Sequence, residues 1–202
     1  MITQDAERLL EYMDGHNIDG ARQMTRGWSH IGALITDAVL QRRQKYKATV
    51  FPRVESLVRE WPDAETIKGF RERIDGGDLS AVIRWKGEER LKQIQDIVSV
   101  FEELGIDDVD TLRLRLGADP DRGEFRSALR RVRHVGQKTV DYVDILAGVE
   151  TGTAVDCRIR KHMKSAGVSN LTYRHVQAVM RQAADARGWR HGDLDAALWN
   201  AS

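Results

Sequence analysis

The sequence has few of the residues that cross-link a chain. Cys157 is the single cysteine among 202 residues. This excludes an internal disulfide framework and any zinc or iron–sulfur site built on several thiolates. No apolar run approaches the ~20 residues that span a bilayer, and the first residues carry acids where a signal peptide carries basic ones. These absences predict a cytoplasmic protein with no membrane partner.

Prolines are also scarce, at positions 52, 62 and 120 only, and each stands at an expected helix boundary. Apolar residues recur at helical spacing along most of the chain, and no strand alternation is long enough to predict a sheet. With 41% apolar residues the chain can bury a core. The sequence therefore predicts an all-α protein. The expected helices cover residues 3–14, 29–45 capped by Ser29, 52–61, 64–74 capped by Asp63, 78–86, 88–104, 107–116, 123–132, 137–147, 155–165, 172–187 and 192–200.

Charge is balanced over the whole chain, with a formal net charge of +1, but it is unevenly distributed. Residues 123–174 contain ten Lys or Arg and five acids. Two interpretations fit this excess: a set of solvated helix faces, or a basic face for nucleic acid.

The stretch RVRHVGQKTVDYV, residues 131–143, predicts two helices joined by a very short turn around Gly136. Glycine permits a positive φ or close backbone approach. The first amides of the second helix, at residues 137–139, would lack intrahelical acceptors and could hold an anion beside Lys138 and Thr139. Alternatively, Gly136 only caps a helix and Lys138 lies in solvent.

A second stretch, GTAVDCRIRKHMKSAGV, covers residues 152–168 and places Asp156 where a helix begins. A carboxylate there can act as an N-cap, or it can serve beside a lysine as part of a reactive site. Cys157 is expected to be a small residue packed at the helix start rather than a nucleophile.

Together these stretches resemble the helix-hairpin-helix DNA glycosylases, in the branch of endonuclease III and the 8-oxoguanine glycosylases. The hairpin pattern L-x-x-L-P-G-V-G-x-K-T-A and the following V-D pattern carry the resemblance. It is strong over about 45 residues and plausible from about residue 29 to the C-terminus. The matching positions are Leu129, Val132, Val135, Gly136, Lys138, Thr139, Val155, Asp156 and Ile159.

The resemblance implies one glycosylase-like domain, residues 1–202, with two helical lobes and DNA bound across a cleft. One lobe would span about 29–122, and the other would combine 1–28 with 123–202, including the hairpin at 126–147. The resemblance also implies that Lys138 attacks the sugar, releases a damaged base and forms a Schiff base that leads to β-elimination. Asp156 would stabilise the cationic sugar.

The sequence departs from the family pattern at two places. Arg133-His134 replaces Pro-Gly, which His134 could accommodate in a left-handed conformation or compensate with phosphate contacts. Cys157-Arg158 replaces the family's Thr-His. By resemblance, Gln44, with Gln41 as the alternative, would fill the gap left by the flipped base. The remaining expected DNA contacts are Arg133, His134, Val135, Gly136, Gln137 and Thr139, while Trp28, Tyr46 and Trp85 could stack on a base or pack in the core.

The expected function is base-excision repair by a bifunctional DNA glycosylase and abasic-site lyase, acting on a damaged base in double-stranded DNA, with an oxidised base as the first expectation. Three alternatives stay open: a monofunctional glycosylase for alkylated or deaminated bases, a non-catalytic DNA-binding module, and an α-helical protein without a nucleic-acid role. No cofactor or iron–sulfur cluster is expected, although a monovalent cation could bind the hairpin. A monomer is the default, and a nucleoid location would follow if the protein is bacterial.

Overall fold

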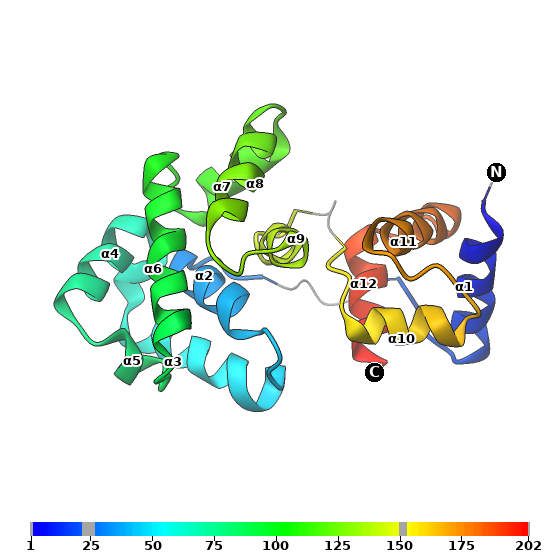
Figure 1. The fold of residues 1–202 in the computed structure, drawn as a ribbon, viewed down its shortest axis with the longest axis horizontal. Helices are drawn as coiled ribbons and strands as arrows, with labels where there is room; N and C mark the ends of the chain where they lie inside the picture. The colour runs from blue at the N-terminus through cyan, green and yellow to red at the C-terminus, as the bar shows by residue number, and fades with distance from the viewer. Residues whose placement is uncertain (1, 22–26, 150–152, 202) are drawn as a thin grey trace. The chain divides into compact units, whose positions relative to one another are not determined.

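The computed structural model describes residues 2–21, 27–149 and 153–201. Over these residues the protein has twelve α-helices and no strand, so the predicted all-α class is confirmed (Figure 1). The chain divides into two compact units. One consists of Gly27–Val149, and the other combines the two ends, Met1–Arg26 and Glu150–Ser202.

The unit Gly27–Val149 is built around α2, Ile31–Leu40, in which every residue is buried. The sequence of α2 is apolar on all sides, as expected for a central helix. Its neighbours include α3, α6 and α9. The remaining elements of this unit are η1 (Tyr46–Val50), α3 (Phe51–Glu60), η2 (Pro62–Glu65), α4 (Ile67–Gly76), α5 (Leu79–Val82), α6 (Glu88–Glu103), α7 (Val109–Gly117), α8 (Asp121–Arg131) and α9 (Gln137–Leu146).

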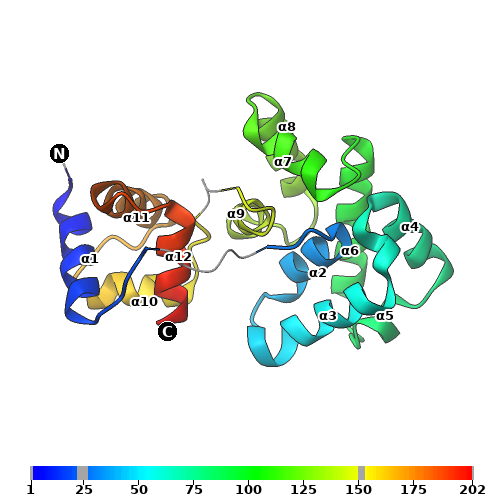
Figure 2. The ribbon, with the colours of Figure 1, turned by 180° about the vertical axis from the view of Figure 1, so that it is seen from behind.

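The other unit packs four helices from the two ends of the chain, as Figure 2 shows from behind. They are α1 (Gln4–Gly15), α10 (Cys157–Ser165), α11 (Tyr173–Arg187) and α12 (His191–Asn200). The apolar stripe of α1 lies against the later helices, with Leu9 and Met13 fully buried beside Met163 and Met180. Burial of one face of each helix supplies the core of this unit.

The predicted helix 29–45 is too long and has the wrong cap. It begins after His30, whose Nδ1 accepts a hydrogen bond from the Ala33 amide at 3.1 Å, so Ser29 is not the cap. On its other side, His30 Nε2 contacts the Trp61 carbonyl oxygen at 3.0 Å. The helix stops at Leu40, and the basic residues that follow lie outside it.

The cap of α4 also differs from the prediction. Thr66, rather than Asp63, accepts the hydrogen bond from the amide of Gly69, at 3.0 Å. Asp63 instead pairs with Arg73, whose Nε lies 2.9 Å from both carboxylate oxygens. Asp63 lies within a short 3₁₀ turn, Pro62–Glu65, that precedes α4, and sequence reasoning had merged the two elements.

The hairpin falls in a different unit from the predicted lobe. The division lies at residues 149–150 rather than 122–123, so α8 and α9 belong with Gly27–Val149. The reason is packing: α9 lies against α2 and buries Val140, Val143 and Leu146.

Candidate nucleic-acid site

The candidate site begins with the turn between α8 and α9, residues 132–136. Val132 and Val135 are buried, and the Val135 amide donates to the Val132 carbonyl at 3.1 Å. Between them His134 has φ +66°, so the predicted left-handed conformation is confirmed. Histidine thus occupies the conformation that glycine adopts more easily. Of the residues predicted to contact DNA, Val135 is buried in the core, whereas Arg133 is exposed.

Gly136 does not have the conformational role that the sequence predicts. Its φ of −102° and ψ of −179° are open to any residue, and no other atom lies within 4 Å of where a Cβ would be. Neither the turn nor packing within the chain therefore requires glycine here. A side chain at this position would only block another molecule from approaching the backbone from solvent.

Fewer backbone amides at the start of α9 are available to an anion than the sequence predicts. The Thr139 amide donates to the Gly136 carbonyl at 3.0 Å, inside the turn. The side chain of Gln137 turns back along α9, and its Nε2 lies 3.2 Å from both carboxylate oxygens of Asp141. Gln137 therefore supports its own helix rather than pointing toward a ligand.

A buried ion-pair network fixes α8 against α9. Asp144 is fully buried and accepts from Arg122 Nη2 at 2.9 Å and from Arg126, which also pairs with Asp141. Burial raises the pKa of Asp144, and the nearby Arg126 charge opposes that rise. Arg126 had been counted toward a basic face, and this is wrong: it neutralises buried acids.

Lys138 is the second residue of α9 and is half-buried, and its Nζ donates to Oε1 of Gln41 at 3.0 Å. The sequence separates these residues by almost a hundred positions, and the packing of α9 on α2 brings them together. Gln41, the alternative to Gln44, is thus the glutamine that contacts the lysine. Gln44 is half-buried in the segment after α2.

Glu89, at the start of α6, connects the end of α2 to the hairpin. It accepts from Arg42 Nη2 at 2.5 Å, and its other oxygen lies 3.3 Å from His134 Nε2. The hydrogen bond from Arg42 lowers the pKa of Glu89. Sequence reasoning missed this residue because nothing in its local pattern distinguishes it from the other acids of α6.

Asp156 is the N-cap of α10, and its Oδ1 accepts from the amides of Arg158 at 2.8 Å and Ile159 at 3.0 Å. The capping interpretation is confirmed, while the chemical role stays a prediction. Asp156 belongs to the unit formed by the chain ends, and Lys138 to Gly27–Val149. Cys157 is exposed, so the expectation that it is packed is wrong.

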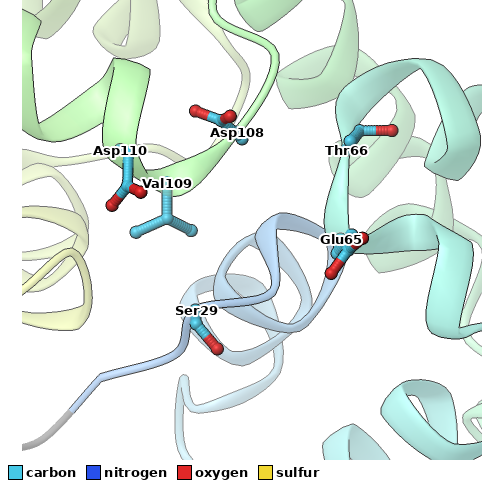
Figure 3. Close-up of a pocket in the computed structure, with 6 residues that line it drawn as sticks. All are labelled: Ser29, Glu65, Thr66, Asp108, Val109 and Asp110. Atoms are coloured by element: carbon cyan, nitrogen blue, oxygen red, sulfur yellow. The ribbon is translucent and has the colours of Figure 1, made fainter.

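A separate pocket lies beside the start of α2 (Figure 3). Asp108 in this pocket caps α7 by accepting from the Thr111 amide at 2.7 Å, and this hydrogen bond lowers its pKa. Thr66 is the cap of α4. Two of the residues that line the pocket are therefore helix N-caps, and the acidic side chains of the pocket would repel a phosphate. Its lining residues are Ser29, Glu65, Thr66, Asp108, Val109 and Asp110.

Metal and membrane sites were also sought among the described residues. No group of three or more His, Cys, Asp or Glu in the described ranges is arranged to hold a metal ion. None of the described helices is both long and apolar enough to cross a membrane.

The comparisons with known proteins identify a family without a described activity. Neither a curated protein nor a solved structure matches the chain. A family model described as a domain of unknown function, DUF8548, matches residues 7–202. This match covers nearly the whole chain, and the chain belongs to that family.

Proposed function

We propose that the protein is a bifunctional DNA glycosylase and abasic-site lyase that removes a damaged base, with an oxidised base as the first candidate. The observation that carries the proposal is the position of Lys138 in the first turn of α9, directly after the short turn that joins α8 to α9. The lysine follows a turn in which His134 takes the left-handed conformation, and Gln41 holds its amine. The proposal also draws on the resemblance of the hairpin and of Val155-Asp156 to the glycosylase pattern.

In the proposed reaction, the neutral amine of Lys138 attacks the anomeric carbon of the sugar while the bond to the base breaks. The departing base takes up a proton, and the sugar ring opens to leave an imine on the lysine. Loss of a proton from the adjacent carbon then breaks the bond to the 3′ oxygen, and water releases the lysine. A hydrogen bond acceptor such as Gln41 aims the amine before attack.

Asp156 is assigned the stabilisation of the positive charge that develops on the sugar. Its Oδ1 accepts two backbone amides, which hold the carboxylate in place at the start of α10. A carboxylate held in one position suits electrostatic stabilisation of a developing charge.

The hairpin would contact the DNA backbone and so position the duplex without reading its sequence. The exposed Arg133 and the open space around Gly136 are the features that support such a contact. The target base would leave the stack at a cost of about a few kcal/mol, which is least for a damaged or mispaired base.

Borohydride trapping on duplex DNA with an abasic site tests the proposal. The wild-type protein should form a covalent adduct, and Lys138→Ala should not. If the wild type forms no adduct, or Lys138→Ala forms as much, the lyase assignment is wrong. A lesion panel of oxidised pyrimidines, 8-oxoguanine, uracil, hydroxymethyluracil and alkylpurines would then identify the base, and release without strand cleavage would indicate a monofunctional enzyme.

One observation favours a second candidate, a DNA-binding module without catalysis. Asp156 has a complete structural role as a helix cap, so its presence does not require chemistry. This candidate predicts salt-sensitive binding to duplex DNA, no base release, and no effect of Asp156→Asn beyond stability.

A further inference from the structure

Asp37 is a carboxylate that α2 holds wholly inside the unit Gly27–Val149. Its Oδ2 accepts from Trp28 Nε1 and from the Tyr46 hydroxyl, both at 2.8 Å. Its Oδ1 accepts from the Tyr142 hydroxyl at 3.1 Å. Burying an ionised carboxylate is costly, and an apolar residue in this central helix would avoid the cost. The carboxylate orients three aromatic rings that come from different parts of the chain.

Two of these rings meet a third that faces solvent. The Trp28 ring stacks on Phe51 with centroids 5.9 Å apart and planes 29° from parallel. Tyr46 also contacts Phe51, with centroids 6.2 Å apart and planes tilted by 48°. Phe51 is 38% exposed, which is unusual for a large apolar side chain; Leu114 is the other such residue in the described part of the chain. We refer to Trp28, Tyr46 and Phe51 as the ring cluster.

Asp37, which orients Trp28 and Tyr46, lies in the same α2–α9 interface as Lys138. Gln41, which holds Lys138, is one helical turn after Asp37 on α2. Tyr142, which donates to Asp37, is one turn after Lys138 on α9. Residues four apart lie on the same face of a helix, so the Asp37–Tyr142 and Gln41–Lys138 pairs are successive contacts of one α2–α9 interface.

Positive charge surrounds the ring cluster. The segment Arg42-Arg43-Gln44-Lys45-Tyr46-Lys47 interleaves one ring of the cluster with four cations. Arg43, Lys45 and Lys47 are exposed. Cations beside partly exposed rings are the arrangement by which proteins hold an unpaired strand, because the cations take the phosphates and the rings stack on bases.

We propose that the ring cluster binds an unpaired nucleobase by stacking, that the cations of residues 42–47 hold the adjoining phosphates, and that Asp37 is the positioning residue that fixes the rings. The inference rests on the proposed function for its biological use, since it supplies a surface for the target base. It does not depend on Lys138 as nucleophile. Stacking of this kind tolerates any base, because every base has a π face.

The test compares two short single-stranded oligonucleotides of equal length and charge, measured by fluorescence anisotropy with the full-length protein. One carries bases and the other consists of stable abasic units. The base-bearing strand should bind about tenfold more tightly, within the range that stacking supplies. Phe51→Ala should reduce that ratio toward one, while Leu114→Ala, at an exposed apolar position on α7, should leave it unchanged.

The positioning role of Asp37 is tested by the same ratio of affinities for the base-bearing and the abasic strand. Asp37→Asn and Tyr46→Phe keep the size of each side chain but weaken the hydrogen bonds that orient the rings. Both should lower the ratio. Urea unfolding of each variant must show that it is still folded, because a partly unfolded protein would lose the stacking surface while its cations still attract both strands. Equal binding of the two strands by the wild type, or an unchanged ratio in Phe51→Ala, overturns the inference.

Failure here is distinguishable from failure of the lyase assignment. A base-dependent ratio without borohydride trapping supports the ring cluster and contradicts the lyase. Trapping without a base-dependent ratio supports the lyase and contradicts the ring cluster.

Discussion

Lys138 Nζ donates a hydrogen bond to Gln41 Oε1 at 3.0 Å, and this contact joins the hairpin to the end of the buried helix α2. The Gln41 amide oxygen is therefore one of the groups that position the lysine amine.

Gln41→Ala should slow borohydride trapping by about tenfold to a hundredfold, because a reactive amine loses the contact that places it. The free energy of unfolding should fall only by about 0.5–1.5 kcal/mol, the usual net value of one hydrogen bond. Rapid-quench trapping and urea unfolding measure the two effects. Gln95→Ala, at an exposed glutamine of α6, is the matched control, and it should retain the wild-type trapping rate on an abasic site. If both variants slow trapping equally, loss of the Lys138–Gln41 hydrogen bond is not the cause.

Gly136→Ala should weaken DNA binding by about tenfold, as expected when a hydrogen bond to a charged phosphate is lost. It should not destabilise the protein, since its backbone angles suit alanine and no atom of the chain lies near the new Cβ. Removing a glycine in such a conformation stabilises proteins by about 0.4–1 kcal/mol. Affinity for a duplex and urea unfolding are the measurements. Gly76→Ala, where a Cβ also meets nothing within 4 Å, controls for the substitution itself. Unchanged affinity in Gly136→Ala would remove the hairpin from the DNA interface.

Glu89→Gln should strengthen DNA binding and steepen its salt dependence. The Glu89 carboxylate lies between Arg42 and His134, where it competes with a phosphate. Freeing one phosphate contact should change the slope of log K against log salt by about 0.9. Glu88→Gln makes the same change in net charge at the neighbouring exposed residue and serves as the control. If both variants bind DNA equally well, the effect belongs to net charge and not to this contact.

Stability should fall in acid partly through His30. Burial lowers the pKa of His30 from its ordinary value of 6.5, so the folded protein holds this ring neutral. Above that value neither state is protonated and stability is complete. As the pH falls below about 6.5, the unfolded chain takes up a proton that the folded chain resists, and stability declines until the pH passes the lower folded pKa.

His30→Asn should flatten this decline, because asparagine can cap α2 and does not titrate. Urea unfolding at a series of pH values, followed by tryptophan fluorescence, measures it. Ser29→Ala removes the residue that the sequence suggested as the cap and should leave both stability and acid response unchanged. An unaltered acid response in His30→Asn would assign the decline to other groups, such as His162, whose pKa burial also lowers.

Local patterns were sufficient to predict the helices of the hairpin region. The expected 123–132 and 137–147 became Asp121–Arg131 and Gln137–Leu146, because the apolar spacing and the short turn act within a few residues. The left-handed His134 was likewise predictable, since two helices that close together leave the turn little choice of backbone angles.

The caps were less predictable because they depend on distant partners. His30 replaces Ser29 as the cap of α2, and its ring is also held by the carbonyl of Trp61, far along the chain. No local rule anticipates a buried histidine at this position, since serine is the more usual N-cap.

The sequence by itself determined the helical class, the hairpin and the positions of Lys138 and Asp156 along the chain, because these follow from spacing and residue type. Only the tertiary structure decided what the side chains meet. It paired Lys138 with Gln41, turned Arg126 inward onto buried acids, and collected Trp28, Tyr46 and Tyr142 around Asp37. The Lys138–Gln41 and Tyr142–Asp37 contacts join residues 97 and 105 positions apart, and they exist because burying the apolar faces of α2 and α9 forces the two helices together.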